Sequence, residues 1–311
     1  MHTLETFGKK FTAPENWDEI TRDQVLFLIR AMNEGQSYNS LMFRLVVEFF
    51  QLPTEKMTFL KHSRPGRYEE YCADLLTATD GLFDFLFEKT TTPPNSPPLD
   101  GLGEVIITKK LTRQLLPGYN GFYGPKAGLS NVQIWEFTMA EAAFMELASP
   151  DSAQRHGGHG VVQRDTEALD RLIATIYRPA RADVEQWRES DEYNLDDRRV
   201  FNDQLIERDM LLIKEWPQEI KDLIFIFFFS CREALQEMFP KIYKNRLKKK
   251  DGKASSWTDV ILQQATEEKK EADEIAVRNM MTFLRQRELV IEDAEYQQDE
   301  FEKITNKNKR T

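Results

Sequence analysis

The feature that most constrains the fold of this 311-residue chain is the apolar run LIFIFFF at positions 223–229. A helix that is apolar around its whole circumference must be buried on most sides. Pro217 lies shortly before the run, and the fixed φ angle of proline suits the first turn of a helix. The sequence therefore predicts a central helix near 217–238. We expect three of its side chains to be nearly fully buried: Phe225, Ile226 and Phe229.

Helical spacing of apolar residues and capping signals recur along the rest of the chain. Thr21 and Gln24 have the spacing of a capping box just before an apolar periodic stretch. We expect residues 1–16 to form a loop and 105–108 (VIIT) to form a short strand. The predicted fold is mainly α: a multi-helix, bundle-like core with long loops and at most a short strand or hairpin. Beyond the central helix, the predicted helices are 22–34, 37–52, 134–148, 166–177, 198–215, 257–269 and 271–301, and the stretch 68–89 is predicted to hold one or two more.

Changes in composition divide the chain into four segments. Residues 90–103 (TTTPPNSPPLDGLG) contain four prolines and two glycines, which cannot hold a helix and indicate a linker or a long loop. We therefore expect an N-terminal helical region at 1–89 and a helical core at 104–254 that includes the central helix. The last segment, 255–311, is predicted to be a charged helical pair.

The charge balance bears on the partners of the chain. It has 42 Lys and Arg residues against 52 Asp and Glu residues, a net charge of −10, which repels phosphate backbones and makes nucleic acid an unfavourable partner. A local exception is the run 241–253, with seven basic residues and one acidic residue, including Lys248, Lys249 and Lys250. The simplest interpretation is a solvated loop after a helix end, where cations are favourable. Binding of DNA through this run is the alternative.

Sequence features also bear on the compartment. The run 223–229 is far too short for a bilayer, which needs about 20 apolar residues. The N-terminal sequence contains no apolar signal segment, so we expect no membrane association. Cys72 and Cys231 both lie in apolar helical stretches, and we expect both to be buried, reduced thiols.

Motifs for catalysis or for cofactor binding are few. His156 and His159 in RHGGHG have a spacing that could place two imidazoles on one metal, but no third ligand is indicated nearby. A Gly-rich surface loop is the simpler interpretation, and a metal-dependent intracellular enzyme using this pair is the alternative. The chain contains no P-loop, dinucleotide-binding or nucleophile-elbow motif. We therefore expect a non-enzymatic protein without a cofactor or a metal.

Two segments are candidates for contact with another protein. The loop 117–128 (PGYNGFYGPKAG) is rich in turn residues and aromatic side chains, and aromatic residues dominate binding hot spots. Packing of this loop into the core is the simpler interpretation, and contact with a partner is the alternative. The helix predicted at 271–301 has only sparse apolar positions, and it either lies on the surface or pairs with another chain. The candidate partner-binding residues are Tyr119, Phe122, Tyr123, Trp135, Lys248, Lys249 and Lys250.

Several stretches in succession resemble a poorly characterised family of proteins from phage and prophage tail-gene clusters. PENWDEITRDQ, near the start, resembles the P-x-x-W-x-E-[IL]-T-x-x-Q opening of that family, and residues 121–140 resemble its YGP-x-[DA]-G-LSN-[LV]-x-x-x-EF-x-x-A signature. LDRLIATIYRP, at 169–179, resembles LD-x-LIA-x-LYRP. Further similarities are the [DR]-R-x-x-FN stretch, the CR-x-x-L-x-x-x-FP pattern that ends the central helix, and a last helical pair containing Trp257 and VRNMMTFL.

The resemblance implies a role in a phage tail module, as a tail assembly factor, a chaperone or a structural component. Its implied partners are other tail-module proteins, with self-association as a further possibility. It implies no catalytic residues, and it places the chain in the cytoplasm of a bacterial host or in the virion. The Pro-rich stretch 90–103 and the HGGHG loop depart from the family pattern and resemble insertions.

Overall fold

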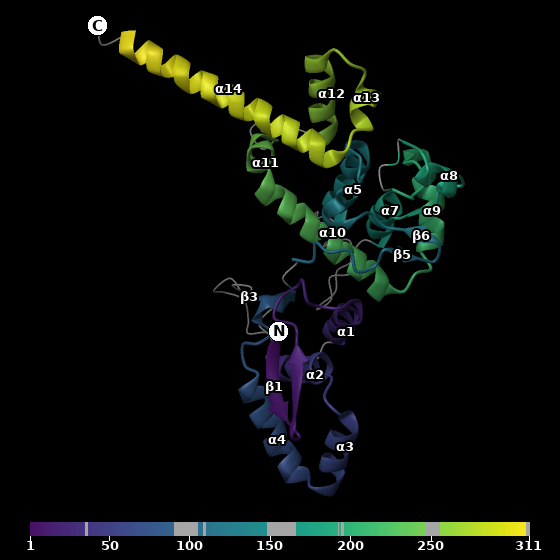
Figure 1. Ribbon diagram of the computed structural model, residues 1–311, viewed down its shortest axis with the longest axis vertical. Helices are drawn as coiled ribbons and strands as arrows, with labels where there is room; N and C mark the ends of the chain where they lie inside the picture. The colour runs from purple at the N-terminus through teal and green to yellow at the C-terminus, as the bar shows by residue number, and fades with distance from the viewer. Residues whose placement is uncertain are drawn as a thin grey trace. The chain divides into compact units, whose positions relative to one another are not determined.

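The computed structural model describes residues 1–34, 37–89, 105–107, 110–147, 166–191, 193, 196–246 and 256–308. Figure 1 shows the succession of helices, and the predicted mainly α fold class is confirmed. Strand content is larger than expected, because three small sheets are present: β1-β2, β3-β4 and β5-β6-β7. The predicted Pro-rich linker and the HGGHG loop lie outside the described residues.

The chain divides into two compact units. The first contains residues 1–115 and 217–227, and the second contains residues 116–216 and 228–311. The predicted segment 1–89 lies in the first unit and the segment 255–311 lies in the second. The segment 104–254 contributes to both, because helix α10 (Gln218–Met238) is divided between them at Phe227.

Helices with a shared aromatic core form the first unit. The predicted capping box at Thr21 is present, with Thr21 and Gln24 each bonding the other's backbone N–H. The ring of Phe83 lies 5.2 Å from that of Phe49 and 6.1 Å from that of Phe50, and all three side chains are buried. The helical elements of this unit, besides the start of α10, are α1 (Arg22–Asn33), α2 (Tyr38–Phe49), α3 (Thr54–Ser63), α4 (Pro65–Ala78) and η1 (Asp84–Leu86).

The N-terminus forms a β-hairpin rather than the expected loop. Strand β1 (His2–Thr6) pairs antiparallel with β2 (Lys9–Ala13). The two turn residues, Phe7 and Gly8, both have positive φ angles, as the tight turns that match the twist of a hairpin require. The Phe7 ring lies 5.1 Å from the ring of Tyr71 on α4, so this contact with the helix supports a strand pair too short to be stable alone.

The expected strand at 105–108 is confirmed as β4 (Val105–Ile107), which pairs antiparallel with β3 (Phe87–Lys89). The stretch 68–89, predicted to hold one or two helices, contains the greater part of α4 and then leaves the helical conformation. Helix α4 stops at Ala78, and the chain continues through η1 into β3.

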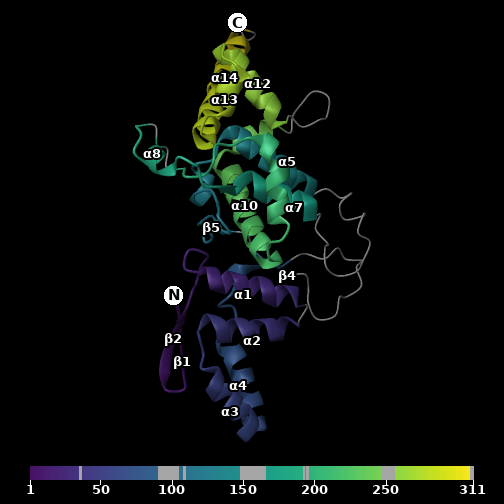
Figure 2. The ribbon, with the colours of Figure 1, turned by 90° about the vertical axis from the view of Figure 1, so that its right-hand side faces the viewer.

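In the second unit, three segments of the chain form a small sheet beside a group of helices. Strand β5 (Gly118–Tyr119) pairs with β6 (Phe122–Tyr123), and β6 also pairs with β7 (Arg178–Pro179). Figure 2 shows the helices of this unit from a second direction. Besides the end of α10, they are η2 (Ala127–Leu129), α5 (Ile134–Leu147), α7 (Thr166–Ile176), α8 (Val184–Arg188), η3 (Asp203–Leu205), α9 (Ile206–Ile213), α11 (Pro240–Arg246), α12 (Trp257–Glu268), α13 (Ala272–Ala276) and α14 (Met280–Asn308).

Two of the predicted helices are shorter or divided. The helix expected at 198–215 begins only at Ile206, because residues 198–202 are extended and Asn202 caps the 3-10 turn η3. The helix expected at 271–301 is two helices, α13 and α14. Between them the chain leaves the helix to pair with the start of α5: the N–H of Ile134 donates to the carbonyl of Arg278, and the N–H of Met280 donates to that of Val132.

The predicted central helix is confirmed as α10. Phe225 is 8% exposed and Ile226 is 4% exposed, but Phe229 is only half-buried, so the expectation for this third residue is wrong. Phe228 is fully buried instead, and its ring lies 5.9 Å from the ring of Phe144 on α5. The apolar run thus includes one position that stays partly accessible.

No helix in the described part of the chain is long and apolar enough to cross a bilayer. Both cysteines are free thiols, as expected, although only Cys231 is buried and Cys72 is half-buried. Burial raises the pKa of the Cys231 thiol to about 12, so this thiol stays protonated at neutral pH.

We predict that Phe228→Ala destabilises the protein by about 3–5 kcal/mol, because removing a buried phenylalanine ring leaves a cavity in the core. Phe59 on α3 is 74% exposed and provides the control, since Phe59→Ala changes stability by less than about 0.5 kcal/mol. Urea unfolding of both variants measures the difference. Equal stability of the two variants would contradict the burial of Phe228.

Candidate functional site

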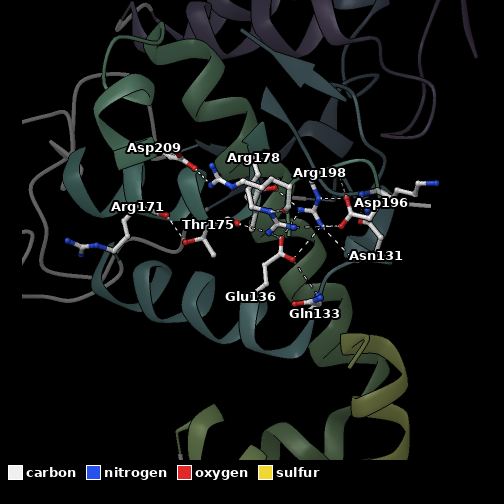
Figure 3. Close-up of polar contacts among 12 residues, drawn as sticks. Asn131, Gln133, Glu136, Arg171, Thr175, Arg178, Asp196, Arg198 and Asp209 are labelled. Atoms are coloured by element: carbon white, nitrogen blue, oxygen red, sulfur yellow. Dashed lines mark hydrogen bonds and ion pairs between the residues drawn. The ribbon is translucent and has the colours of Figure 1, made fainter. Parts of the chain in front are cut away.

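A buried network of charged side chains lies at the centre of the second unit. Figure 3 shows Glu136, Arg178, Arg198 and Asp196 pointing toward one another. Their side chains are 0%, 4%, 1% and 12% exposed, respectively. They come from α5, from β7 and from the extended segment before α9, so the network joins three parts of the chain that are distant in sequence.

Both arginines converge on one carboxylate oxygen. Glu136 Oε1 lies 2.8 Å from Nη1 of Arg178 and 2.7 Å from Nη1 of Arg198. Glu136 stands in the first turn of α5, where the helix dipole favours a negative charge. Asp196 provides the second carboxylate and holds Arg198 with two bonds of 2.8 Å, from Nε and from Nη2. This two-point contact fixes the plane of the guanidinium group.

Backbone carbonyls accept further hydrogen bonds from the two guanidinium groups. Arg178 donates from Nε to the carbonyl of Arg199 at 2.8 Å, and Arg198 donates from Nη1 to that of Ile176 at 2.8 Å. Ile176 is in the last turn of α7, and carbonyl groups in the last turn of a helix have no hydrogen-bond donor within that helix. The arginines therefore also terminate α7 and hold the extended segment in place.

The electrostatics of the network follow from burial and from charge. Burial lowers the pKa of Arg178, and the positive charge of Arg198 lowers it further against the opposing effect of Glu136. Burial also lowers the pKa of Arg198, but the charges of Glu136 and Asp196 outweigh it and the pKa rises. Two cations face two anions, so the network is neutral overall, as burial of charges requires.

Sequence reasoning missed this network, although the signal for it was present. Glu136 is the glutamate of the EF-x-x-A motif, Arg178 is the arginine of YRP, and Arg198 is the arginine that opens R-x-x-FN. Charged residues inside otherwise apolar motifs indicate buried ion pairs. What the sequence lacks is any local indication that these three positions contact one another.

The aromatic loop is largely packed against Trp216. The rings of Tyr119 and Phe122 lie 5.0 Å and 5.5 Å from the Trp216 ring. Phe122 is 5% exposed, whereas Tyr123 is 45% exposed. Of the three predicted contact residues in this loop, Tyr123 therefore presents the most surface to a partner.

Trp135 is half-buried and lies at the edge of an open hollow of about 430 Å³. Arg199, Val200 and Phe201 form other parts of its wall. Phe201 also contacts the buried network, because its ring centroid lies 5.4 Å from Cζ of Arg178. The hollow thus borders the network through Phe201.

The first two turns of α14 are fixed by contacts with α11 and α12. Phe283 and Leu284 are fully buried. Glu288 accepts hydrogen bonds from the backbone N–H groups of Lys241 and Ile242 at the start of α11, at 3.2 and 3.1 Å. Arg287 donates to Gln264 on α12 at 2.9 Å.

The part of α14 after Glu288 is largely exposed, and Figure 1 shows it extending beyond α11 and α12. Five large apolar side chains in this part are between 43% and 70% exposed. They are Leu289, Val290, Tyr296, Phe301 and Ile304.

Other predicted site residues lie outside the described part of the chain. They are His156, His159, Lys248, Lys249 and Lys250. Of the basic run 241–253, Lys241 is described, and its Nζ lies 2.9 Å from a carboxylate oxygen of Glu295 on α14. Within the described ranges, no group of three or more His, Cys, Asp and Glu side chains could hold a metal ion.

Comparison with known proteins gives no relative: no family model, no curated protein and no solved structure matches this chain.

We predict that Glu136→Gln destabilises the protein by about 3–5 kcal/mol, because it leaves Arg178 and Arg198 buried with a single carboxylate. The control is Glu146→Gln, which removes an ion pair with Arg171 from a side chain that is 51% exposed. Such surface pairs contribute about 0–1 kcal/mol. Urea unfolding followed by circular dichroism compares the two, and equal effects would contradict a buried network.

We also predict that the half-buried ion pair between Arg278 and Glu268, at the end of α12, makes stability depend on pH. Arg278 donates to Glu268 at 2.6 Å and, together with Gln264, lowers the pKa of that carboxyl to about 2 from 4.5. The folded carboxyl has the lower pKa, so the stabilisation is complete above about pH 4.5 and is lost as the pH falls toward 2. Urea unfolding should therefore separate wild type from Glu268→Gln at pH 6 more than at pH 3. A difference independent of pH would contradict this assignment.

Proposed function

We propose that this chain is a non-enzymatic protein that acts by binding other proteins, and that its partners are proteins of a phage or prophage tail module. The observation that carries the proposal is the part of α14 after Glu288. There, Tyr296, Phe301 and Ile304 are 67%, 70% and 58% exposed on a helix whose first turns are fixed. Phe301 and Ile304 are three residues apart and share one face of the helix, and exposed apolar patches mark sites of protein association.

The tail-module context rests on the resemblance of the successive sequence motifs. Tail proteins assemble in the host cytoplasm, so the chain acts there or is carried into the virion. The buried ion network supports a binding role rather than a catalytic one, because the charged residues of those motifs hold the second unit together. Glu136, Arg178 and Arg198 all bond to other groups of the chain.

We predict that the chain retains a tail-module protein when the whole gene cluster is expressed together, and that deletion of residues 293–311 abolishes this retention. The deletion spares the buried residues of α14, which end at Glu288, so the fold should persist. The affinity tag belongs at the N-terminus, because a tag at the other end would adjoin the proposed contact. Far-ultraviolet circular dichroism verifies that the shortened chain is folded.

The control for this experiment is Phe59→Ala, which removes an equally exposed aromatic side chain from the first unit and should leave retention unchanged. Retention of the tail protein by the shortened chain would remove α14 from the proposal. Failure of the full chain to retain any tail protein would contradict the proposed function. Salt-sensitive DNA binding that is lost on neutralising Lys248, Lys249 and Lys250 would favour the DNA-associated alternative instead.

A further inference from the structure

The exposed part of α14, after Glu288, carries a regular stripe of residues along one face. Val290, Ala294, Gln297, Phe301 and Ile304 follow one another at spacings of four, three, four and three residues. This is the spacing at which the side chains of one helix meet those of another in a coiled coil. We call these five residues the terminal stripe. Its apolar members Val290, Phe301 and Ile304 are 43%, 70% and 58% exposed.

The surroundings of the terminal stripe are strongly acidic. Between Leu289 and Glu302 the sequence contains six acidic residues and no lysine or arginine. Asp293 and Glu300 stand one residue before Ala294 and Phe301, which places them along the flank of the stripe. A helix that docks on the stripe would bring its own flanking side chains close to these carboxylates.

Helix α11 shows that α14 pairs with a basic helix through carboxylates on the face opposite the terminal stripe. It is a short helix with the sequence PKIYKNR, and its Ile242 is 3% exposed. Its Lys241 lies 2.9 Å from Glu295 and 3.9 Å from Glu292, both on α14. A basic, amphipathic helix therefore packs against α14 within this chain, and its Lys241 pairs with carboxylates in the exposed part of α14.

We propose that the terminal stripe binds a basic amphipathic helix of a partner protein, in a two-helix coiled coil. The 15 residues from Val290 to Ile304 span about 21 Å along the helix axis, so the partner helix contributes about four turns. It presents apolar side chains at three- and four-residue spacing, flanked by lysine or arginine. This inference rests on the proposed function for the role of α14 as a docking element, and it adds the chemistry of the partner.

A second copy of the chain fits this surface less well than a basic partner. Pairing of two terminal stripes, parallel or antiparallel, would bring two runs of six acidic residues together. Like charges directly across an interface suppress association. Charge thus selects against self-association through α14 and in favour of a cationic partner.

The test uses the full chain and a synthetic peptide as the probe. The peptide is an amphipathic helix of about four turns, with leucine at the stripe spacing and lysine at the flanking positions. A second peptide has glutamate in place of every lysine. We predict that the lysine peptide binds, that its affinity falls steeply with added salt, and that the glutamate peptide does not bind. Fluorescence anisotropy of labelled peptides measures both.

Variants of the chain assign the binding to the terminal stripe. Phe301→Ala combined with Ile304→Ala should weaken binding of the lysine peptide at least tenfold without changing the net charge. Asp293→Asn combined with Glu300→Gln should weaken it and reduce its salt dependence. The control is Leu262→Ala on α12, whose side chain is 51% exposed and should be neutral.

Equal binding of the two peptides, or an equal effect of Leu262→Ala, would overturn the inference. So would a dimer in analytical ultracentrifugation that Phe301→Ala with Ile304→Ala dissociates, since the occupant would then be a second copy. The two proposals can fail separately. Peptide binding without retention of a tail protein contradicts the tail-module function alone, whereas retention of a tail protein by a chain that ignores the lysine peptide contradicts this inference alone.

Discussion

The second unit depends on the pairing of two buried guanidinium groups with two carboxylates. Glu136, Arg178, Arg198 and Asp196 cancel one another's charge where water is excluded, and each of them needs the others to remain ionised at low cost. Burial of a charge without its partner is far more costly than burial of the pair. The start of α5, the strand β7 and the segment before α9 must therefore come together as one assembly.

Other parts of the unit take their positions from this assembly. Strand β7, which carries Arg178, pairs with β6 and so places the aromatic loop against Trp216. At the start of α5, the N–H of Ile134 donates to the carbonyl of Arg278. This hydrogen bond sets the point where α14 begins. The same helix start thus holds the glutamate of the network and directs the helix that we propose as the docking element.

Local signals made much of the fold predictable, and long-range pairing explains what was not. The capping box of Ser256 and Asp259 and the apolar run of α10 act within one or two helical turns, so the sequence alone indicates both helices. The break between α13 and α14 arises from pairing with residue 134, far earlier in the chain, and no local pattern encodes it. The same holds for the ion network. The motifs contain its residues, but no local pattern indicates that Glu136 and Arg198, about sixty positions apart, contact each other.

An exposed helix end with few tertiary contacts needs local interactions to persist, because short isolated helices are marginal in water. The end of α14 has them: Gln298 donates to Glu302, and Lys303 pairs with Glu300. A helix formed before a partner arrives loses less conformational entropy on binding than a disordered tail would. The acidic residues that would repel a second copy of α14 thus occur together with local side-chain bonds that keep the helix formed. A preformed helix of this charge is suited to a basic partner helix.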